Sequence, residues 1–509
     1  MASNGFPFRV GCVDTGSNAI RFLAAEFTGP TEFETLAYQR VPVRLGHQVF
    51  LTGQLAPQAM DGAVAAFASF RDQMKGLEMD SFRAVATSAV REAKNGFELV
   101  GRILEETGIV LEMISGSEEA RLVHLAVANR VDLTGGQWIL TDLGGGSVEV
   151  SLVDDMGMLW TESHTMGSVR LLEELSEAGP ESPGYQRLLS DYVSTLRIPY
   201  PAQYWSPAGF VATGGNIEAL ADLAGVQRTA LGVGTLPSKD LRSAIDLLSR
   251  LSYRERMTQL GLREDRADVI LPAAMVYHHL ARLASAEAIL VPGVGVKEGI
   301  LVDLVDDLIS HTTHEVRRDQ QLTKAAISFG RRFMFDEAHG LHVGKLALSI
   351  FDQTEELHGL GTQNRRRLLA ASILHDIGAF VGHKRHHKHS LYILSHSELP
   401  SLSSNDMLMV ANIARYHRKN IPRAHHPDFV RLSNEDQERT TILASILRVA
   451  DALDRSHFQN VEEVKVSWGK KEMTLQLAGE GDLLLERWAV SRKKTLFGKT
   501  FDRAVTVKT

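Results

Sequence analysis

Two short loops in the first 150 residues combine acids and glycines in the pattern expected of a phosphate site. In the segment DLGGGSVE, Asp142 and Glu149 flank three consecutive glycines and a serine. Glycines let backbone N–H groups converge on phosphate oxygens, and the flanking carboxylates suit a hard divalent cation. The segment DTGSN, residues 14–18, repeats this design. A single glycine loop is often a plain hairpin turn, but two of them predict a phosphate clamp with an acid on each side.

Two further segments between these loops carry groups that phosphate chemistry requires. ATSAVREAKNG places Arg91 just after a strand-like run, and arginine offers phosphate a planar fork of donors. SGSEEARL places Glu118 and Glu119 at the start of a helical pattern. Such a pair often only complements the helix dipole. Beside a metal-held phosphate, however, a carboxylate can accept a proton from the attacking water.

Taken in order, DTGSNAIRF, ATSAVREAKN, ISGSEEARL and DLGGGSVEV resemble the motifs of the exopolyphosphatase / guanosine pentaphosphate phosphohydrolase (Ppx/GppA) family. The resemblance covers most of the chain and implies the actin/Hsp70/sugar-kinase fold. It implies Glu119 as the general base, with Asp14, Asp142 and Glu149 as magnesium and water-orienting acids. The implied substrate-binding residues are Ser17, Asn18, Arg91, Gly144, Gly145, Gly146, Ser147, Gly214, Gly215 and Lys297.

Two segments depart from the family pattern. ATGGN has Asn216 where the family usually has threonine, and PGVGVKEGIL replaces the usual glycine–leucine–arginine–glutamate–glycine sequence while Lys297 keeps the positive charge. These changes leave the hydrolytic residues intact and affect the second-loop contacts and nucleoside specificity.

Helical patterns dominate from about residue 303, and four residues within them resemble the H…HD…D ligand set of HD-type metal phosphohydrolases. The four are His342, His375, Asp376 and Asp451. Imidazoles with carboxylates suit one divalent metal. Two interpretations stay open: the histidines are structural or anion-binding, or they form a second metal site with its own activity. His386, His389 and His417 are candidates to extend that site.

Charge is distributed unevenly along the chain. Residues 311–509 carry 30 Lys and Arg against 23 Asp and Glu, whereas residues 1–310 carry 25 against 39. The basic runs lie at 365–367, 383–389 and 415–419, and they usually indicate only a solvated face. Because they recur with histidines in one segment, they favour a polyanion-binding surface. We expect Lys384, Arg385, His386 and Arg418 to contribute to it.

The elements that must position these groups form an α/β part followed by a helical part. Both halves of the first 305 residues begin with a strand, a glycine loop and a second strand, which indicates duplication. With the resemblance, we expect two actin/Hsp70-like (ribonuclease H-like) α/β domains at 1–125 and 126–305. We also expect an all-α HD-like domain at 306–460 and a small α+β domain at 461–509.

Composition is that of a globular protein with a single cysteine, Cys12, which excludes an intrachain disulfide. No signal-peptide pattern and no apolar run of about 20 residues is seen, so we expect a cytoplasmic protein without membrane or nucleic-acid partners. The predicted function is magnesium-dependent release of orthophosphate from inorganic polyphosphate. The alternatives are a guanosine pentaphosphate (pppGpp) 5′-phosphohydrolase and a non-catalytic polyphosphate or alarmone sensor. We further expect K⁺ as an accompanying cation, a second divalent metal in the helical domain, and a homodimer.

Overall fold

The structure is a computed structural model that describes residues 5–155, 157–176, 184–198, 207–309 and 311–509. The chain divides into two compact units, unit 1 (Met1–His314) and unit 2 (Glu315–Thr509). The predicted boundaries at 125/126, 305/306 and 460/461 stay predictions. No helix in the described part of the chain is long and apolar enough to cross a membrane.

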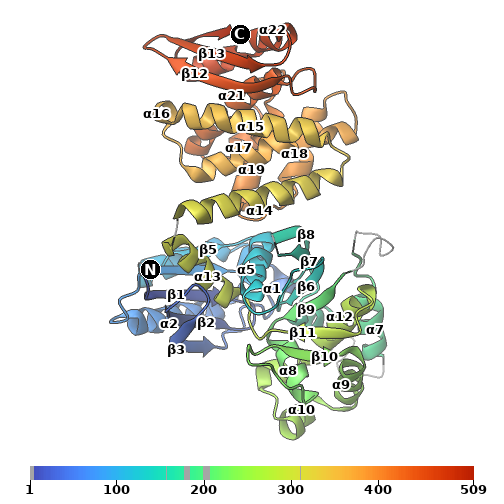
Figure 1. Cartoon of the computed structure of the whole chain (residues 1–509). Coiled ribbons are helices and arrows are strands. Elements are labelled where there is room, and N and C mark those ends of the chain that lie inside the picture. The colour runs from blue at the N-terminus through green and yellow to red at the C-terminus, as the bar shows by residue number, and fades with distance from the viewer. Residues whose placement is uncertain (1–4, 156, 177–183, 199–206, 310) are drawn as a thin grey trace. The chain divides into compact units, whose positions relative to one another are not determined.

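Unit 1 contains two mixed sheets with related topology (Figure 1). The first has the order β3-β2-β1-β4-β5, formed by β1 (Phe8–Thr15), β2 (Ile20–Phe27), β3 (Phe33–Val41), β4 (Ser81–Ala86) and β5 (Leu111–Met113). The second has the order β10-β11-β9-β6-β7-β8, formed by β6 (Trp138–Leu143), β7 (Val148–Asp154), β8 (Gly157–His164), β9 (Gly209–Thr213), β10 (Gly234–Pro237) and β11 (Ala288–Val291).

The two sheets repeat one pattern of five strands. β1 pairs antiparallel with β2 and parallel with β4, and β6 pairs antiparallel with β7 and parallel with β9. The outer partners also correspond, because β2–β3 and β7–β8 are antiparallel while β4–β5 and β9–β11 are parallel. The duplication predicted from the two glycine loops is therefore confirmed at the level of sheet topology.

The helices of unit 1 pack on these sheets, and two of them approach each other closely. Buried side chains of β1, β6, α5 (Gly116–Ala128) and α13 (Val296–Ile309) share one hydrophobic cluster. A Cβ atom on Gly299 of α13 would lie only 1.9 Å from the Leu122 carbonyl oxygen of α5. Glycine is therefore needed where the helices cross. The remaining helices are α1 (Val49–Thr52), α2 (Pro57–Met74), α3 (Ser88–Glu92), α4 (Gly96–Thr107), α6 (Ser168–Glu174), α7 (Tyr185–Val193), α8 (Gly215–Leu223), α9 (Ser238–Arg250), α10 (Tyr253–Leu260), α11 (Glu264–Ala267) and α12 (Ile270–Leu283).

Unit 2 is mainly helical and ends in a three-stranded sheet. After α14 (His311–Arg331), which crosses the boundary of the units, its elements are α15 (Glu337–Gln353), α16 (Glu355–His358), α17 (Thr362–Leu374), the 3₁₀ turn Ile377–Phe380, α18 (His386–Ser395), α19 (Ser404–Arg415), α20 (Pro427–Val430), α21 (Asn434–Leu453), β12 (Val461–Trp468), β13 (Glu472–Gly479), α22 (Leu484–Lys493), α23 (Thr495–Thr500) and β14 (Ala504–Lys508). The helical pattern predicted from about residue 303 is confirmed.

The sheet of unit 2 shares the hydrophobic core of its helices. Val464 and Leu475 lie in the same buried cluster as Ile350 and Leu447. The Gln353 side chain of α15 donates to the Val464 carbonyl at 2.8 Å and accepts from the Val466 N–H at 2.8 Å. An amide side chain thus satisfies the edge of β12 as a neighbouring strand would.

Candidate active site

The two glycine loops have the same backbone geometry at the ends of equivalent strands. The Gly16 N–H donates to the Ala19 carbonyl at 3.2 Å, and the Gly144 N–H donates to the Ser147 carbonyl at 3.0 Å. The loops also approach each other, because a Cβ atom on Gly145 would lie 2.8 Å from the Ser17 Cβ atom. This contact explains why position 145 is glycine, whereas the equivalent position of the first loop carries the Ser17 side chain.

Three buried carboxylates converge where the loops meet. Glu119 comes from the first turn of α5, Asp142 from the end of β6, and Glu149 from the start of β7, and one oxygen of each lies within 4.8 Å of the others. The hydroxyls of Ser147 and Ser163 both donate to Glu149 Oε1 at 2.7 Å. In the described residues, Glu119 Oε2 and Glu149 Oε2 have no hydrogen-bond donor. Their lone pairs are therefore open to a cation.

Burial and mutual repulsion perturb these acids. Burial, followed by the charge of Asp142, raises the pKa of Glu149 to about 7. Burial and then the charge of Glu149 raise the pKa of Glu119 well above its usual range. Burial also raises the pKa of Asp142, although a hydrogen bond from Thr213 Oγ1 at 2.6 Å opposes it. Three adjacent buried carboxylates favour either protonation or a divalent cation.

Glu118 and Glu119, which the sequence did not distinguish, point in different directions from α5. Consecutive helical residues point in different directions. Glu118 Oε2 accepts from Arg121 Nε at 2.7 Å, and Arg121 Nη1 donates to Asp303 of α13 at 2.9 Å. Although burial alone raises the pKa of Glu118, Arg121 lowers it to about 2. Glu118 therefore belongs to a buried ion-pair network that joins α5 to α13. Only Glu119 faces the acid cluster, and Arg91 Nη1 lies 3.7 Å from its Oε2 atom.

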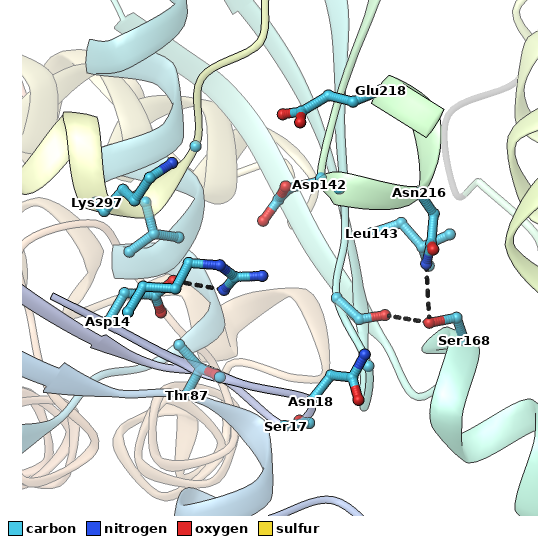
Figure 2. A pocket seen from close by; sticks show the side chains of 18 of the residues that line it. Asp14, Ser17, Asn18, Thr87, Asp142, Leu143, Ser168, Asn216, Glu218 and Lys297 are labelled. Carbon is cyan, nitrogen blue, oxygen red and sulfur yellow. Dashed lines mark hydrogen bonds and ion pairs between the residues drawn. The ribbon is translucent and has the colours of Figure 1, made fainter. Parts of the chain in front are cut away.

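A pocket of about 300 Å³ opens onto this cluster (Figure 2). Asp14 and Lys297 face Asp142 and Glu218 across it. The predicted site residues that line it are Asp14, Ser17, Asn18, Glu119, Asp142, Gly144, Gly145, Gly214, Gly215 and Lys297. Four predicted residues of unit 1 are not among the lining residues: Arg91, Gly146, Ser147 and Glu149. Arg91 Nη1 donates to the Ile114 carbonyl at 2.7 Å, and Ser147 supports Glu149.

Sequence reasoning missed several polar residues of the pocket. Arg21 lies within the quoted motif DTGSNAIRF and donates to Asp14 Oδ2 at 3.0 Å. Thr213, which precedes the second glycine pair and is not itself in the pocket wall, donates to Asp142 Oδ1 and holds that lining carboxylate. Arg40, Arg263 and Arg266 add positive charge from distant segments, and no sequence signal marks them. Within the residues that the structure describes, no ion pair involves Arg266, so its guanidinium is available to an anion.

The residues present fit a magnesium ion. All the atoms that the acid cluster offers to a metal are oxygens, as a hard cation prefers. Two of these oxygens are buried and accept no hydrogen bond from the described residues. Asp14 lines the same pocket, and Arg21 already neutralises one of its oxygens. Asp142 and Glu149 are thus better placed than Asp14 to hold such an ion.

The basic residues predicted for polyanion binding belong to unit 2 and are described within it. Lys384 and Arg385 are exposed, whereas His386 is buried and Arg418 Nη1 lies 3.2 Å from its Nε2 atom. The run 365–367 does not form the free basic face that its sequence suggested. Its three arginines pair with acids of unit 2: Asp319, Asp352, Glu315 and Asp406. Intramolecular ion pairs therefore occupy this part of the basic excess.

The structure differs from the predicted HD-type ligand set at one position. His375, Asp376 and Asp451 gather as predicted. His342 Nε2 instead lies 2.8 Å from the Val461 carbonyl of β12, and His339, one turn earlier on α15, faces the other three. The face of α15 toward the cluster carries His339, while the face toward the sheet carries His342.

Comparisons with known proteins cover both units. The sequence profile of the Ppx/GppA phosphatase family matches residues 25–308, and that of Ppx/GppA phosphatase domain III matches residues 323–491. A guanosine-5′-triphosphate,3′-diphosphate pyrophosphatase of Vibrio vulnificus is 24% identical over 470 residues, 91% of each chain. Exopolyphosphatase 1 of Mycobacterium tuberculosis is 28% identical over 307 residues, 58% of this chain and 88% of that protein.

Solved structures agree with these matches. An exopolyphosphatase from Cytophaga hutchinsonii superposes with a TM-score of 0.55 at 27% identity, covering 58% of this chain and 98% of that chain. Its actin-like fold corresponds to the paired mixed sheets of unit 1. The family predicted from four ordered motifs is confirmed: this chain belongs to the Ppx/GppA phosphatase family.

Proposed function

We propose that this protein is an exopolyphosphatase that releases terminal orthophosphate from inorganic polyphosphate with Mg²⁺. The observation that carries the proposal is the placement of Glu119. This carboxylate lines the pocket, lacks a hydrogen-bond donor on Oε2 in the described residues, and adjoins Asp142 and Glu149. It is the arrangement required for water attack on a phosphate held beside a cation.

The residues of the pocket divide the reaction between them. Backbone N–H groups of the two glycine loops, with Arg266 and Lys297, bind and orient the phosphate oxygens. Glu119 accepts the proton of the attacking water, because it lines the pocket and its Oε2 atom has no hydrogen-bond donor among the described residues. Asp142 and Glu149 would hold the Mg²⁺, which when bound neutralises charge on the phosphate oxygens.

One structural observation favours the alternative substrate, pppGpp. A second cavity of about 960 Å³ adjoins the same loop through Ser17 and Asn18 and includes Leu51, Val169 and Tyr253 in its wall. Its volume suits a nucleoside, and its wall combines these apolar side chains with polar and charged groups such as Arg44, Glu173 and Asp268, whereas polyphosphate has no apolar part. The full-length relatives named for guanosine pentaphosphate keep this alternative open. A cytoplasmic homodimer that uses K⁺ stays a prediction.

Orthophosphate release from long-chain polyphosphate and from pppGpp, with Mg²⁺, tests the proposal. We expect faster release from polyphosphate, and a loss of about 10²- to 10⁴-fold in Glu119→Gln, because that variant cannot accept the proton. Glu105→Gln, which removes an exposed carboxylate on α4, is the matched control and should retain activity. Preference for pppGpp would establish the alternative. Binding without turnover would indicate a sensor, and full activity of Glu119→Gln would refute the assigned base.

A further inference from the structure

A second group of metal-binding side chains lies inside unit 2. It gathers residues from α15, the end of α17, the start of α18, the end of α19 and α21. Its members are His339, His375, Asp376, His386, His417 and Asp451. Neither the family comparisons nor the proposed polyphosphate chemistry assigns a role to this group.

Hydrogen bonds fix the orientation of the two histidines nearest to the surface. His386 Nδ1 lies 3.1 Å from the His383 carbonyl oxygen, and His417 Nδ1 lies 2.6 Å from the Ala414 carbonyl oxygen. A carbonyl oxygen only accepts hydrogen bonds, so each Nδ1 must carry the hydrogen. Each Nε2 atom of a neutral ring therefore presents a lone pair to the cluster, as in metal-binding histidines held by an outer acceptor.

The two deeper histidines are held in the same way. His375 Nδ1 lies 2.8 Å from the Ser372 carbonyl oxygen, and His339 Nδ1 lies 2.8 Å from Asp454 Oδ2. Both side chains are only 1% exposed. Their Nε2 atoms have no hydrogen-bond partner in the part of the chain that the structure describes. All four imidazoles thus direct Nε2 into one space.

The distances between three of these acceptors suit a metal ion. Asp376 Oδ1 lies 3.0 Å from His386 Nε2 and 3.3 Å from His417 Nε2, and the two Nε2 atoms are 3.2 Å apart. Ligands at about 2.0 to 2.1 Å from a tetrahedral zinc-like ion are separated by roughly 3.3 Å. Arg418 Nη1 lies 3.2 Å from His386 Nε2. This one cationic group offsets only part of the repulsion among the lone pairs of Asp376 Oδ1, His386 Nε2 and His417 Nε2.

A second set of ligands adjoins the first and shares Asp376. His375 Nε2 lies 3.8 Å from Asp376 Oδ1 and 3.6 Å from Asp451 Oδ1, and His339 Nε2 lies 3.8 Å from Asp451 Oδ1. The separations are wider, so this set would contract around an ion. A carboxylate shared by two sets can bridge two ions.

A basic pocket opens directly onto these ligands. It has a volume of about 190 Å³, and its wall combines Asp376, His386, His417 and Asp451 with four cationic side chains. The four are Arg418, Arg455, Arg492 and Lys493. Lys493 forms an ion pair with Asp451 Oδ2. The volume suits a phosphate or diphosphate group rather than a whole nucleotide, and clustered guanidinium groups beside a metal are typical of phosphate binding.

We propose that unit 2 contains a second metal centre in which Asp376, His386 and His417 bind a divalent transition-metal ion and the adjoining basic pocket binds a phosphate group of a ligand to that ion. His339, His375 and Asp451 form the neighbouring position. The site is chemically different from that of unit 1, because imidazole nitrogens select transition metals over Mg²⁺.

Cobalt binding to the full-length protein tests the metal centre without an activity assay. Imidazole-ligated tetrahedral Co²⁺ absorbs visible light much more strongly than Co²⁺ held only by oxygens. We expect this band in the wild-type protein, and elemental analysis of dialysed protein should show at least one more ion per chain than Asp376→Asn or His417→Asn. His342→Asn is the matched control, because it removes a histidine of α15 that bonds to Val461 instead.

The outcomes separate a metal from its alternatives. If wild type shows no imidazole band, a proton or Lys493 alone neutralises the cluster and the proposal fails. If Asp376→Asn and His417→Asn, with unchanged circular dichroism, keep the band and the metal content of wild type, these residues are not the ligands and the proposal also fails. Loss of the band in both variants but not in His342→Asn supports it.

Inorganic phosphate then tests the basic pocket. Added to the cobalt-loaded protein, it should change the visible band, since an anion that reaches the open position alters the ligand field. Arg418→Gln should weaken this response at least tenfold, while Lys470→Gln, an exposed lysine in the turn after β12, should not. No response to phosphate, or an equal response in the two variants, would refute phosphate binding while leaving the metal centre intact.

Discussion

The pKa of Glu149 predicts that magnesium stabilises this protein more strongly as the pH rises. Burial and Asp142 raise that pKa from 4.5 to about 7. A group with a raised pKa in the folded state stabilises the fold fully below pH 4.5, and this contribution disappears as the pH rises through 7. Without metal, the folded protein should therefore lose stability between pH 5 and 8. Mg²⁺ binds the ionised acids and should restore it at the high end.

The magnitude follows from the same values. The shift from 4.5 to about 7 corresponds to about 3 kcal/mol, at about 1.36 kcal/mol per pKa unit. Unit 1 ends at His314, and a unit of that length unfolds with an entropy of roughly 0.7 kcal/mol/K. The melting temperature of metal-free unit 1 should therefore fall by roughly 4 °C from well below pH 4.5 to well above pH 7 because of Glu149 alone, and most of that fall should occur between pH 5 and 8.

Scanning calorimetry of chelator-treated protein between pH 5 and 8, with and without Mg²⁺, measures this effect. Glu149→Gln keeps an oxygen for Ser147 and Ser163 but cannot ionise, so at pH 8 it should stabilise the metal-free protein and abolish most of the magnesium effect. The difference between wild type and variant cancels the titration of other groups, and Glu105→Gln should behave as wild type. A magnesium effect equal at pH 5 and pH 8, or unchanged in Glu149→Gln, would refute the reasoning.

Two packing predictions test how the site is held. Gly146→Ala places a Cβ atom 2.4 Å from the Phe50 ring, so the loop must shift; we expect a loss of about 1–3 kcal/mol in urea unfolding and a raised KM, and wild-type values for both would contradict the close approach. Arg121→Met removes one of the two guanidinium groups that pair with the buried Glu118 and Asp303 and leaves Arg83 alone to hold both carboxylates; calorimetry should show a loss of up to about 3–5 kcal/mol, and a loss below 1 kcal/mol would mean that Arg83 alone satisfies them.

The sequence was sufficient where a local pattern determines the geometry. A strand, a glycine turn and a second strand place Asp14 and Asp142 at equivalent positions, and the structure repeats both the turn hydrogen bond and the strand order. Glu149 follows from the same pattern, because antiparallel pairing sets it opposite Asp142. These relations depend on residues close in sequence, so they are visible without a fold.

Predictions were weaker where the decision depends on a distant partner. His339 and His342 are separated by three residues on α15, and either could turn toward the metal ligands. Asp454 holds His339 in the cluster and the Val461 carbonyl holds His342 away from it, and both partners lie more than 100 residues further along the chain. Arg266 reaches the phosphate pocket for the same kind of reason: only the folded position of its segment brings it there.

The two cation sites of this chain differ in a way that sets their metals apart. The acids of unit 1 supply only oxygens, which suit Mg²⁺ and its waters. Unit 2 supplies four imidazole nitrogens around two carboxylates, a set that binds transition metals far more tightly than Mg²⁺. Cellular Mg²⁺ can therefore fill the oxygen site of unit 1 without displacing a transition-metal ion from the imidazole site of unit 2.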